Sequence, residues 1–191
     1  AMKTALSNEN AFSLLRPPGH HAGKKSLGGF CYFNNIAIAV KLGLKSTDKI
    51  AIIDIDGHHG NGTQDIFLGD KNVLFVSLHQ KSAYPLSGFV NTDNCLNYPL
   101  LPGTKTNEYL DVLDKAVDNV MDFNPDLVAV SAGFDTYKKD PLLELELDQG
   151  AYYEIARSIK LVEKPIFAVL EGGYSTDLPL CIAEFLQGLR D

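Results

Sequence analysis

Cysteine is scarce in this chain of 191 residues, which contains only three. Cys31, Cys95 and Cys181 lie far apart, their number is odd, and no C-x-x-C spacing occurs among them. Neither a disulfide framework nor a thiolate zinc site is therefore indicated. Because thiols without such roles suit a reducing compartment, we expect a cytoplasmic protein.

Long hydrophobic runs and clusters of basic residues are also missing. No apolar stretch approaches the roughly 18 to 20 residues that a membrane-spanning helix needs, and the first residues lack the apolar core of a secretion signal. The 17 Lys and Arg residues against 24 Asp and Glu give a formal net charge of −7. We therefore expect no membrane insertion and no direct nucleic-acid binding, whereas an acidic rim would suit a cationic substrate.

Enough hydrophobic material is present for one core. The composition, 45% hydrophobic and 21% charged, fits a single domain spanning residues 1–191. Strand-like runs alternate with helical patterns, which predicts an α/β fold with a mainly parallel sheet flanked by helices. Strands are predicted from Ile50 to the carboxylates Asp54 and Asp56 and at 72–78, 126–132 and 165–170, and helices at 36–44, 64–68, 105–123, 150–162 and 178–189. Residues 80–97 are predicted to form a long functional loop.

The stretch from Ile50 to Gly62 carries the densest polar pattern, I-A-I-I-D-I-D-G-H-H-G-N-G. Residues two apart in a strand share a face, so Asp54, Asp56 and His58 can aim at one point beyond the strand. In parallel α/β sheets this carboxyl end is where ligands bind. An Asp-x-His pair suits a divalent transition metal that needs a third protein ligand. Alternatively, these side chains only brace a turn by hydrogen bonds.

Polar residues follow other predicted strands as well. Asp135 comes just after the strand at 126–132 and could be a third metal ligand, or else a turn or helix-cap residue. Tyr174 follows the strand at 165–170, where its phenol could donate a hydrogen bond to an oxyanion, or else cap the core.

A second histidine pair, His20-His21, follows two prolines on a rigid loop. Two imidazoles held at one site suit general acid–base chemistry, although surface histidines are common. Further along, the exposed backbone at Gly29 and the ring of Phe30 could form part of a pocket wall.

Five motifs together make the chain resemble the zinc-dependent histone deacetylase family, in its class II and bacterial or archaeal deacetylase-like branch, which shares its sheet with arginases. They are R-P-P-G-H-H-A (16–22), G-G-F-C-Y-F-N-N (28–35), I-D-I-D-G-H-H-G-N-G-T-Q (53–64), S-A-G-F-D (131–135) and L-E-G-G-Y (170–174).

The resemblance implies a role for each matching residue. Zn²⁺, or alternatively Fe²⁺, would be bound by Asp56, His58 and Asp135. The catalytic groups would be His21 as general base, His20 as its electrostatic partner, Asp54 and Asn61 as the groups that orient these histidines, and Tyr174 as the oxyanion donor. A structural K⁺ would be bound by Asp54, Asp56, His58, Ser77 and Leu78.

The implied substrate is acetyl-lysine or a related acylated amine. Gly29, Phe30 and Tyr84 would line a tunnel around its four-carbon stem. Leu142 stands where polyamine-selective relatives resemble one another in having Glu, which favours lysine-like substrates over polyamines.

The resemblance also implies that the N-terminal part of the family fold is missing, because only fifteen residues precede R-P-P-G-H-H-A. Another chain, or a second copy of this one, could complete the domain. The leading interpretation is an amidohydrolase that removes acetyl groups. The alternatives are a non-catalytic module that binds acyl-lysine or assembles with a partner, and an arginase-like hydrolase with two metals.

Overall fold

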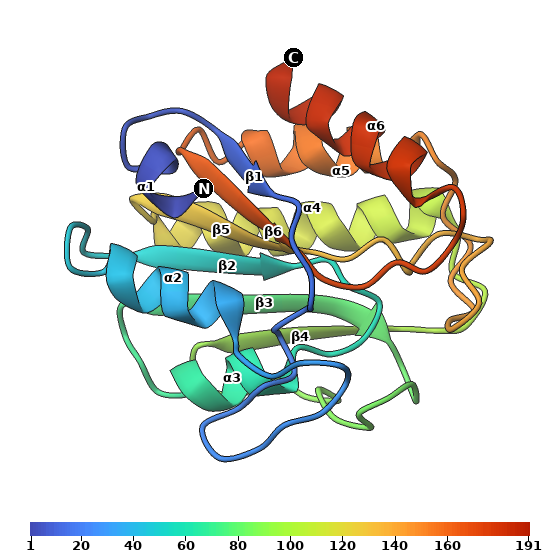
Figure 1. The fold of residues 1–191 in the computed structure, drawn as a ribbon, viewed down its shortest axis with the longest axis horizontal. Coiled ribbons are helices and arrows are strands. Elements are labelled where there is room, and N and C mark those ends of the chain that lie inside the picture. The colour runs from blue at the N-terminus through green and yellow to red at the C-terminus, as the bar shows by residue number, and fades with distance from the viewer.

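A single parallel sheet of six strands runs through the middle of the molecule, which the computed structural model describes over residues 1–191 (Figure 1). In the order β1-β6-β5-β2-β3-β4 across the sheet, the strands are β1 (Ala11–Ser13), β6 (Ile166–Leu170), β5 (Leu127–Ala132), β2 (Ile50–Asp54), β3 (Val73–Gln80) and β4 (Cys95–Leu100). Every pair of neighbours is parallel, so all six strands end at the same edge.

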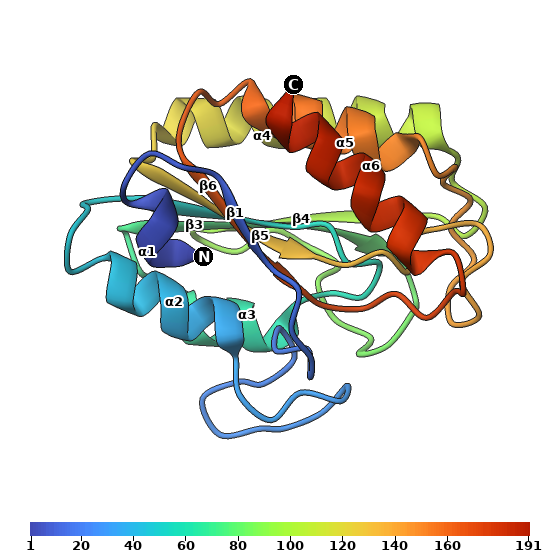
Figure 2. The same cartoon turned by 45° about the horizontal axis from the view of Figure 1, so that its top comes forward.

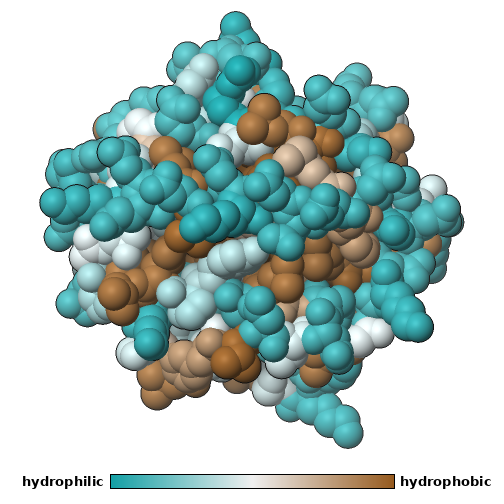
Figure 3. Space-filling model, turned by 180° about the vertical axis from the view of Figure 1, so that it is seen from behind, coloured by the Kyte–Doolittle hydropathy of each residue, from teal (hydrophilic) through white to brown (hydrophobic).

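Helices cover both faces of this sheet, three on each side (Figure 2). One side carries α1 (Met2–Ala5), α2 (Asn35–Gly43) and α3 (Asn61–Phe67), and the other carries α4 (Thr106–Phe123), α5 (Ala151–Lys160) and α6 (Leu178–Arg190). Seen from the side of α4 and α5, the surface is mostly hydrophilic with smaller hydrophobic patches (Figure 3). None of the helices is both long and apolar enough to cross a membrane.

The alternation of side chains along β2 explains the two hydrophobic cores. Ala51 and Ile53 belong to the larger core, beneath α4, α5 and α6, while Ile50 and Ile52 belong to the smaller core, beneath α1 and α2. A strand buried on both faces reads as a continuous apolar run, as this one does. The predicted α/β fold with a parallel sheet is therefore confirmed.

Both edge strands of the sheet differ from the prediction, and β1 was not among the predicted strands. Part of the predicted 80–97 loop is the start of β4, which pairs with β3 alone at the edge of the sheet. Its polar Asn97 and its Pro99 obscured the strand pattern, and an edge strand tolerates proline because one side of it needs no ladder partner.

The loop that links β3 to β4 is anchored on two buried histidines, His59 and His79, whose ring centroids lie 4.7 Å apart. His79 donates from Nε2 to the carbonyl of Gly88 at 3.0 Å, and His59 Nδ1 lies 2.7 Å from the Ser87 hydroxyl. At Gly88, where φ is +73°, an added Cβ would meet both rings within 2.7 Å. These imidazoles therefore seat the loop that carries Tyr84.

Replacing Ile53 tests the larger core. Ile53→Ala should lower the free energy of unfolding by about 2–5 kcal/mol, because this fully buried side chain leaves a cavity in the central strand. Ile38→Ala is the matched control, since Ile38 is 52% exposed on α2, and it should change stability by about 0.5 kcal/mol or less. Urea denaturation measures both, and equal losses would contradict the assignment of the core.

The buried histidine His79 should make stability fall at acidic pH. Burial, with the neighbouring His59, lowers the pKa of His79 from 6.5 to about 3, so its contribution is complete above pH 6.5 and is lost as the pH falls towards 3. Between pH 7.5 and pH 5, the free energy of unfolding of the wild type should fall by about 2 kcal/mol more than that of His79→Gln, because glutamine does not titrate. Urea denaturation at each pH gives the two profiles, and parallel profiles would refute the prediction.

Candidate active site

Three potential metal ligands meet just beyond the carboxyl ends of β2 and β5. His58 Nδ1 lies 2.7 Å from Asp135 Oδ2 and 3.2 Å from Asp56 Oδ1. Ligand atoms of all three residues lie within 4.8 Å of one another. Because β2 and β5 are parallel neighbours, residues 77 positions apart in the chain reach the same point. The structure thus brings together the three residues predicted to hold a metal.

The chemistry of this donor set fits a divalent cation. Asp56 and Asp135 are fully buried, and burial together with the charge of Asp56 raises the pKa of Asp135 to about 7. Burial works against a charged His58, yet its hydrogen bonds to the two carboxylates raise its pKa to about 10. The three side chains therefore favour a positive charge between them. Zn²⁺ or Fe²⁺ would supply that charge, and both ions accept nitrogen and oxygen ligands.

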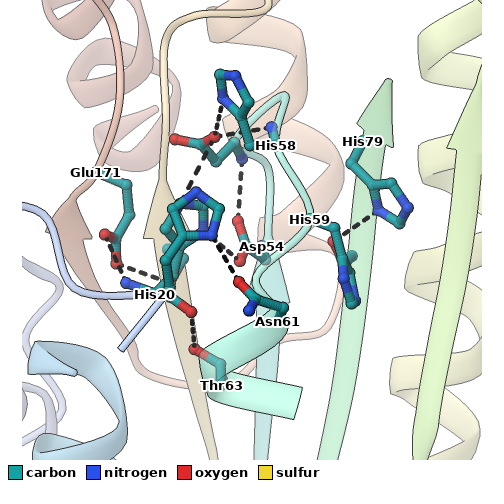
Figure 4. Close-up of polar contacts among 12 residues, drawn as sticks. His20, Asp54, His58, His59, Asn61, Thr63, His79 and Glu171 are labelled. Carbon is teal, nitrogen blue, oxygen red and sulfur yellow. Dashed lines mark hydrogen bonds and ion pairs between the residues drawn. The ribbon is translucent and has the colours of Figure 1, made fainter. Parts of the chain in front are cut away.

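The His20-His21 loop is held against the sheet from several sides. Glu171, the residue after β6, is fully buried and accepts hydrogen bonds from the backbone N–H groups of Gly19 at 2.6 Å and His20 at 3.1 Å. The N–H of Thr63, on α3, donates to the His20 carbonyl, and the Asn34 amide, at the start of α2, donates to Ala22. These contacts set where the two imidazoles lie (Figure 4).

His20 carries a positive charge because it is buried among carboxylates. Its Nδ1–H donates to Asp54 Oδ2 at 2.9 Å, and its Nε2 lies 3.8 Å from Asp56 Oδ1. Burial opposes the charge, but the two aspartates outweigh it and raise the pKa of His20 well above 6.5.

His21 is held neutral beside it, with ring centroids 4.0 Å apart. Burial and the charge of His20 lower the pKa of His21 to about 3. Asn61 Oδ1 can only accept a hydrogen bond, so His21 Nδ1, 2.8 Å away, carries the proton. The other ring nitrogen, Nε2, therefore keeps a lone pair, as a general base requires.

A pocket of about 380 Å³ lies over these groups. Its lining includes the four predicted substrate-binding residues, Gly29, Phe30, Tyr84 and Leu142, together with His20, His21, Asp56, His58 and Tyr174. Gly29 has a φ of +52°, and an added Cβ would lie 2.0 Å from the His21 ring, so only glycine fits at this wall.

Tyr174 reaches the same pocket from the loop after β6. Its ring makes an edge contact with Phe30 at 6.0 Å between centroids, and the Arg16 guanidinium lies 5.5 Å from its ring centroid. Burial, with nearby carboxylates, raises the pKa of Tyr174 above 10. The phenol therefore keeps its proton and can donate a hydrogen bond into the pocket.

Four residues near the site do not line the pocket: His59, Ser77, Leu78 and Glu171. His59, in the same H-H pair as His58, points to His79 and away from the pocket (Figure 4). Ser77 lies opposite Asp54 in the sheet register, whereas Leu78 packs into the larger core, leaving only its backbone carbonyl for an ion. No role was predicted for Glu171, although a carboxylate at the end of an apolar strand is the same signal that singled out Asp54.

Comparisons with known proteins agree with this geometry. Residues 1–189 match the histone deacetylase domain. A probable deacetylase of Archaeoglobus fulgidus is 44% identical over 88% of this chain and 51% of its own length, and acetylpolyamine amidohydrolase 1 of Pseudomonas aeruginosa is 39% identical over 94% and 55%. The crystal structure of an acetylpolyamine aminohydrolase from Burkholderia pseudomallei superposes with a TM-score of 0.94 at 32% identity, covering 98% of this chain and 58% of that one. The chain therefore spans between half and two thirds of the length of these relatives, and it belongs to the histone deacetylase family.

Proposed function

We propose that this protein is a metal-dependent deacetylase that hydrolyses the amide bond of acetyl-lysine or a related acylated amine. One observation carries the proposal: the neutral His21, whose Nδ1–H donates to Asn61 Oδ1, lines the same pocket as two of the three candidate metal ligands. Members of the family named as deacetylases and acetylpolyamine amidohydrolases support hydrolysis over a non-catalytic binding module.

In the proposed reaction, water adds to the acetyl carbonyl carbon and the C–N bond breaks to give acetate and a free amine. When bound by Asp56, His58 and Asp135, Zn²⁺ or Fe²⁺ supplies Lewis acidity for this chemistry. His21 Nε2 takes the proton of the attacking water and returns it to the leaving nitrogen. Tyr174 donates its hydrogen bond to the oxygen that becomes negative.

The substrate class follows from the pocket wall. Phe30, Tyr84 and Leu142 offer apolar surface to a methylene stem, at about 0.8 kcal/mol per buried CH₂ group. Leu142 is uncharged at the position where polyamine-selective relatives have Glu. This favours a lysine-like stem over a polyamine with a second ammonium group. Acetylpolyamines remain part of the proposal as related substrates, because relatives of this chain are named acetylpolyamine amidohydrolases.

Further parts of the proposal concern ions, assembly and location. A structural K⁺ would be held by Asp54, Asp56, His58 and Ser77 with the carbonyl of Leu78. Assembly with a second copy or a completing chain remains part of the proposal, as does a cytoplasmic location. The buried ligand set consists of two carboxylates and one imidazole, which suits one ion and does not favour the arginase-like pair.

Acetate release tests the proposed function. The protein should release acetate from an acetyl-lysine peptide, and His21→Ala should lower kcat by about 10²- to 10⁴-fold because the general base is lost. A chelator should abolish the activity, and added Zn²⁺ or Fe²⁺ should restore it. Phe33→Ala, an exposed residue outside the pocket, serves as control. Activity that survives both the chelator and His21→Ala would remove this mechanism.

The pH profile tests the role of Asn61. Asn61→Asp places a negative charge beside His21 Nδ1, which stabilises the imidazolium and raises the pKa of His21. The base then becomes protonated at higher pH, so the acidic limb of kcat/KM should move up by about 1 to 3 pH units. Asn119→Asp adds the same charge on exposed α4 and should leave the limb in place. Coincident limbs in all three proteins would exclude His21 as the base.

A further inference from the structure

The buried carboxylate of Asp140 joins two walls of the pocket. Its Oδ2 accepts a hydrogen bond from the backbone N–H of Tyr174 at 2.7 Å, and its Oδ1 accepts one from the N–H of Leu142 at 3.0 Å. Asp140 is 7% exposed and does not itself line the pocket. One side chain therefore holds the backbone of both the predicted oxyanion donor and Leu142, a residue predicted to contact the substrate stem.

The position of Tyr174 depends on few other contacts. The preceding residue, Gly173, has a φ of +120°, and its carbonyl accepts a hydrogen bond from the Arg16 guanidinium at 2.7 Å. On the other side of the same peptide group, the Tyr174 N–H has Asp140 as its acceptor. The peptide group between Gly173 and Tyr174 is thus hydrogen-bonded at its oxygen to Arg16 and at its nitrogen to Asp140.

The backbone around Leu142 likewise has few hydrogen bonds to position it. Pro141 stands between it and Asp140 and has no N–H to donate. The hydrogen bond from Leu142 back to Asp140 therefore sets the turn that points this residue at the pocket. Because both bonds end on one buried carboxylate, a displacement of Asp140 would move both walls of the pocket.

We propose that Asp140 is a positioning residue that sets the separation of Tyr174 and Leu142, and so couples substrate binding to oxyanion stabilisation. The proposal rests on the proposed function for its catalytic consequence. The simpler alternative is that Asp140 only stabilises a surface turn, as Asp70 does. Asp70 also accepts the N–H two residues ahead, at 3.2 Å from Asn72, but its second oxygen binds only the Lys41 ammonium group.

Kinetics of paired variants separate the two roles. Asp140→Ala should lower kcat about 10- to 100-fold, because Tyr174 moves, and raise KM, because Leu142 moves. In a Tyr174→Phe background, Asp140→Ala should lower kcat by about twofold at most, since the group through which it acts is already gone. Asp140→Asn, which keeps one carbonyl oxygen as acceptor, should lie between the wild type and Asp140→Ala. Asp70→Ala should match the wild type. Equal losses of kcat in both backgrounds would overturn the proposal.

Amide hydrogen exchange tests the same contacts without turnover. Asp140→Ala should speed exchange at Tyr174 and Leu142 together, two sites 32 residues apart, whereas Asp70→Ala should speed it at Asn72 alone. Unchanged exchange at either Tyr174 or Leu142 would refute the proposal. If the wild type releases no acetate, the proposed function fails, and the exchange measurement still decides whether Asp140 holds the two walls.

Discussion

The structure depends on carboxylates that are buried at one edge of the sheet and satisfied by the backbone of the loops above it. Asp56 accepts the N–H groups of His58 and Gly172, Asp135 accepts that of Gly57, and Glu171 accepts two from the His20 loop. An unpaired buried carboxylate is costly, so each of these loops gains by closing onto the sheet. The same contacts that stabilise the negative charges therefore also place the side chains that we propose to be catalytic. Asp140 extends the arrangement to the outer wall of the pocket.

This concentration of negative charge divides the histidines into two kinds. His20 lies among the carboxylates and is charged, whereas His21, one residue further, faces that charge and an uncharged amide and is neutral. Adjacent groups whose environments push their pKa values apart are typical of acid–base catalysis. His59 and His79 are neutral chiefly because of burial, as His21 is, and neither has a carboxylate partner that would raise its pKa. Within one small region, identical residue types thus balance charge, provide a neutral imidazole suited to proton transfer, and anchor a loop.

Much of the fold could be predicted from the pattern of apolar residues. The buried strands β2, β3, β5 and β6 are continuous apolar runs, and α4 shows one apolar stripe, so local composition was sufficient for them. The edge strand β4 was missed because an edge strand needs only one ladder partner and one buried face, which leaves room for polar residues and proline. The candidate metal ligands Asp56, His58 and Asp135 could be predicted because a short Asp-x-His run and an Asp after a strand are local signals.

The sequence alone determined which polar side chains stand at strand ends and which face of the strand they share, because that alternation is a property of the extended backbone. Only the tertiary structure decided that β5 lies beside β2 and β6 beside β5, so that Asp135 meets His58 and Glu171 supports His20. It also decided that His58 faces the pocket while its neighbour His59 turns to β3. These outcomes depend on which distant segments supply a donor for each buried carboxylate or imidazole, and such pairings form only when the whole sheet and its loops are assembled.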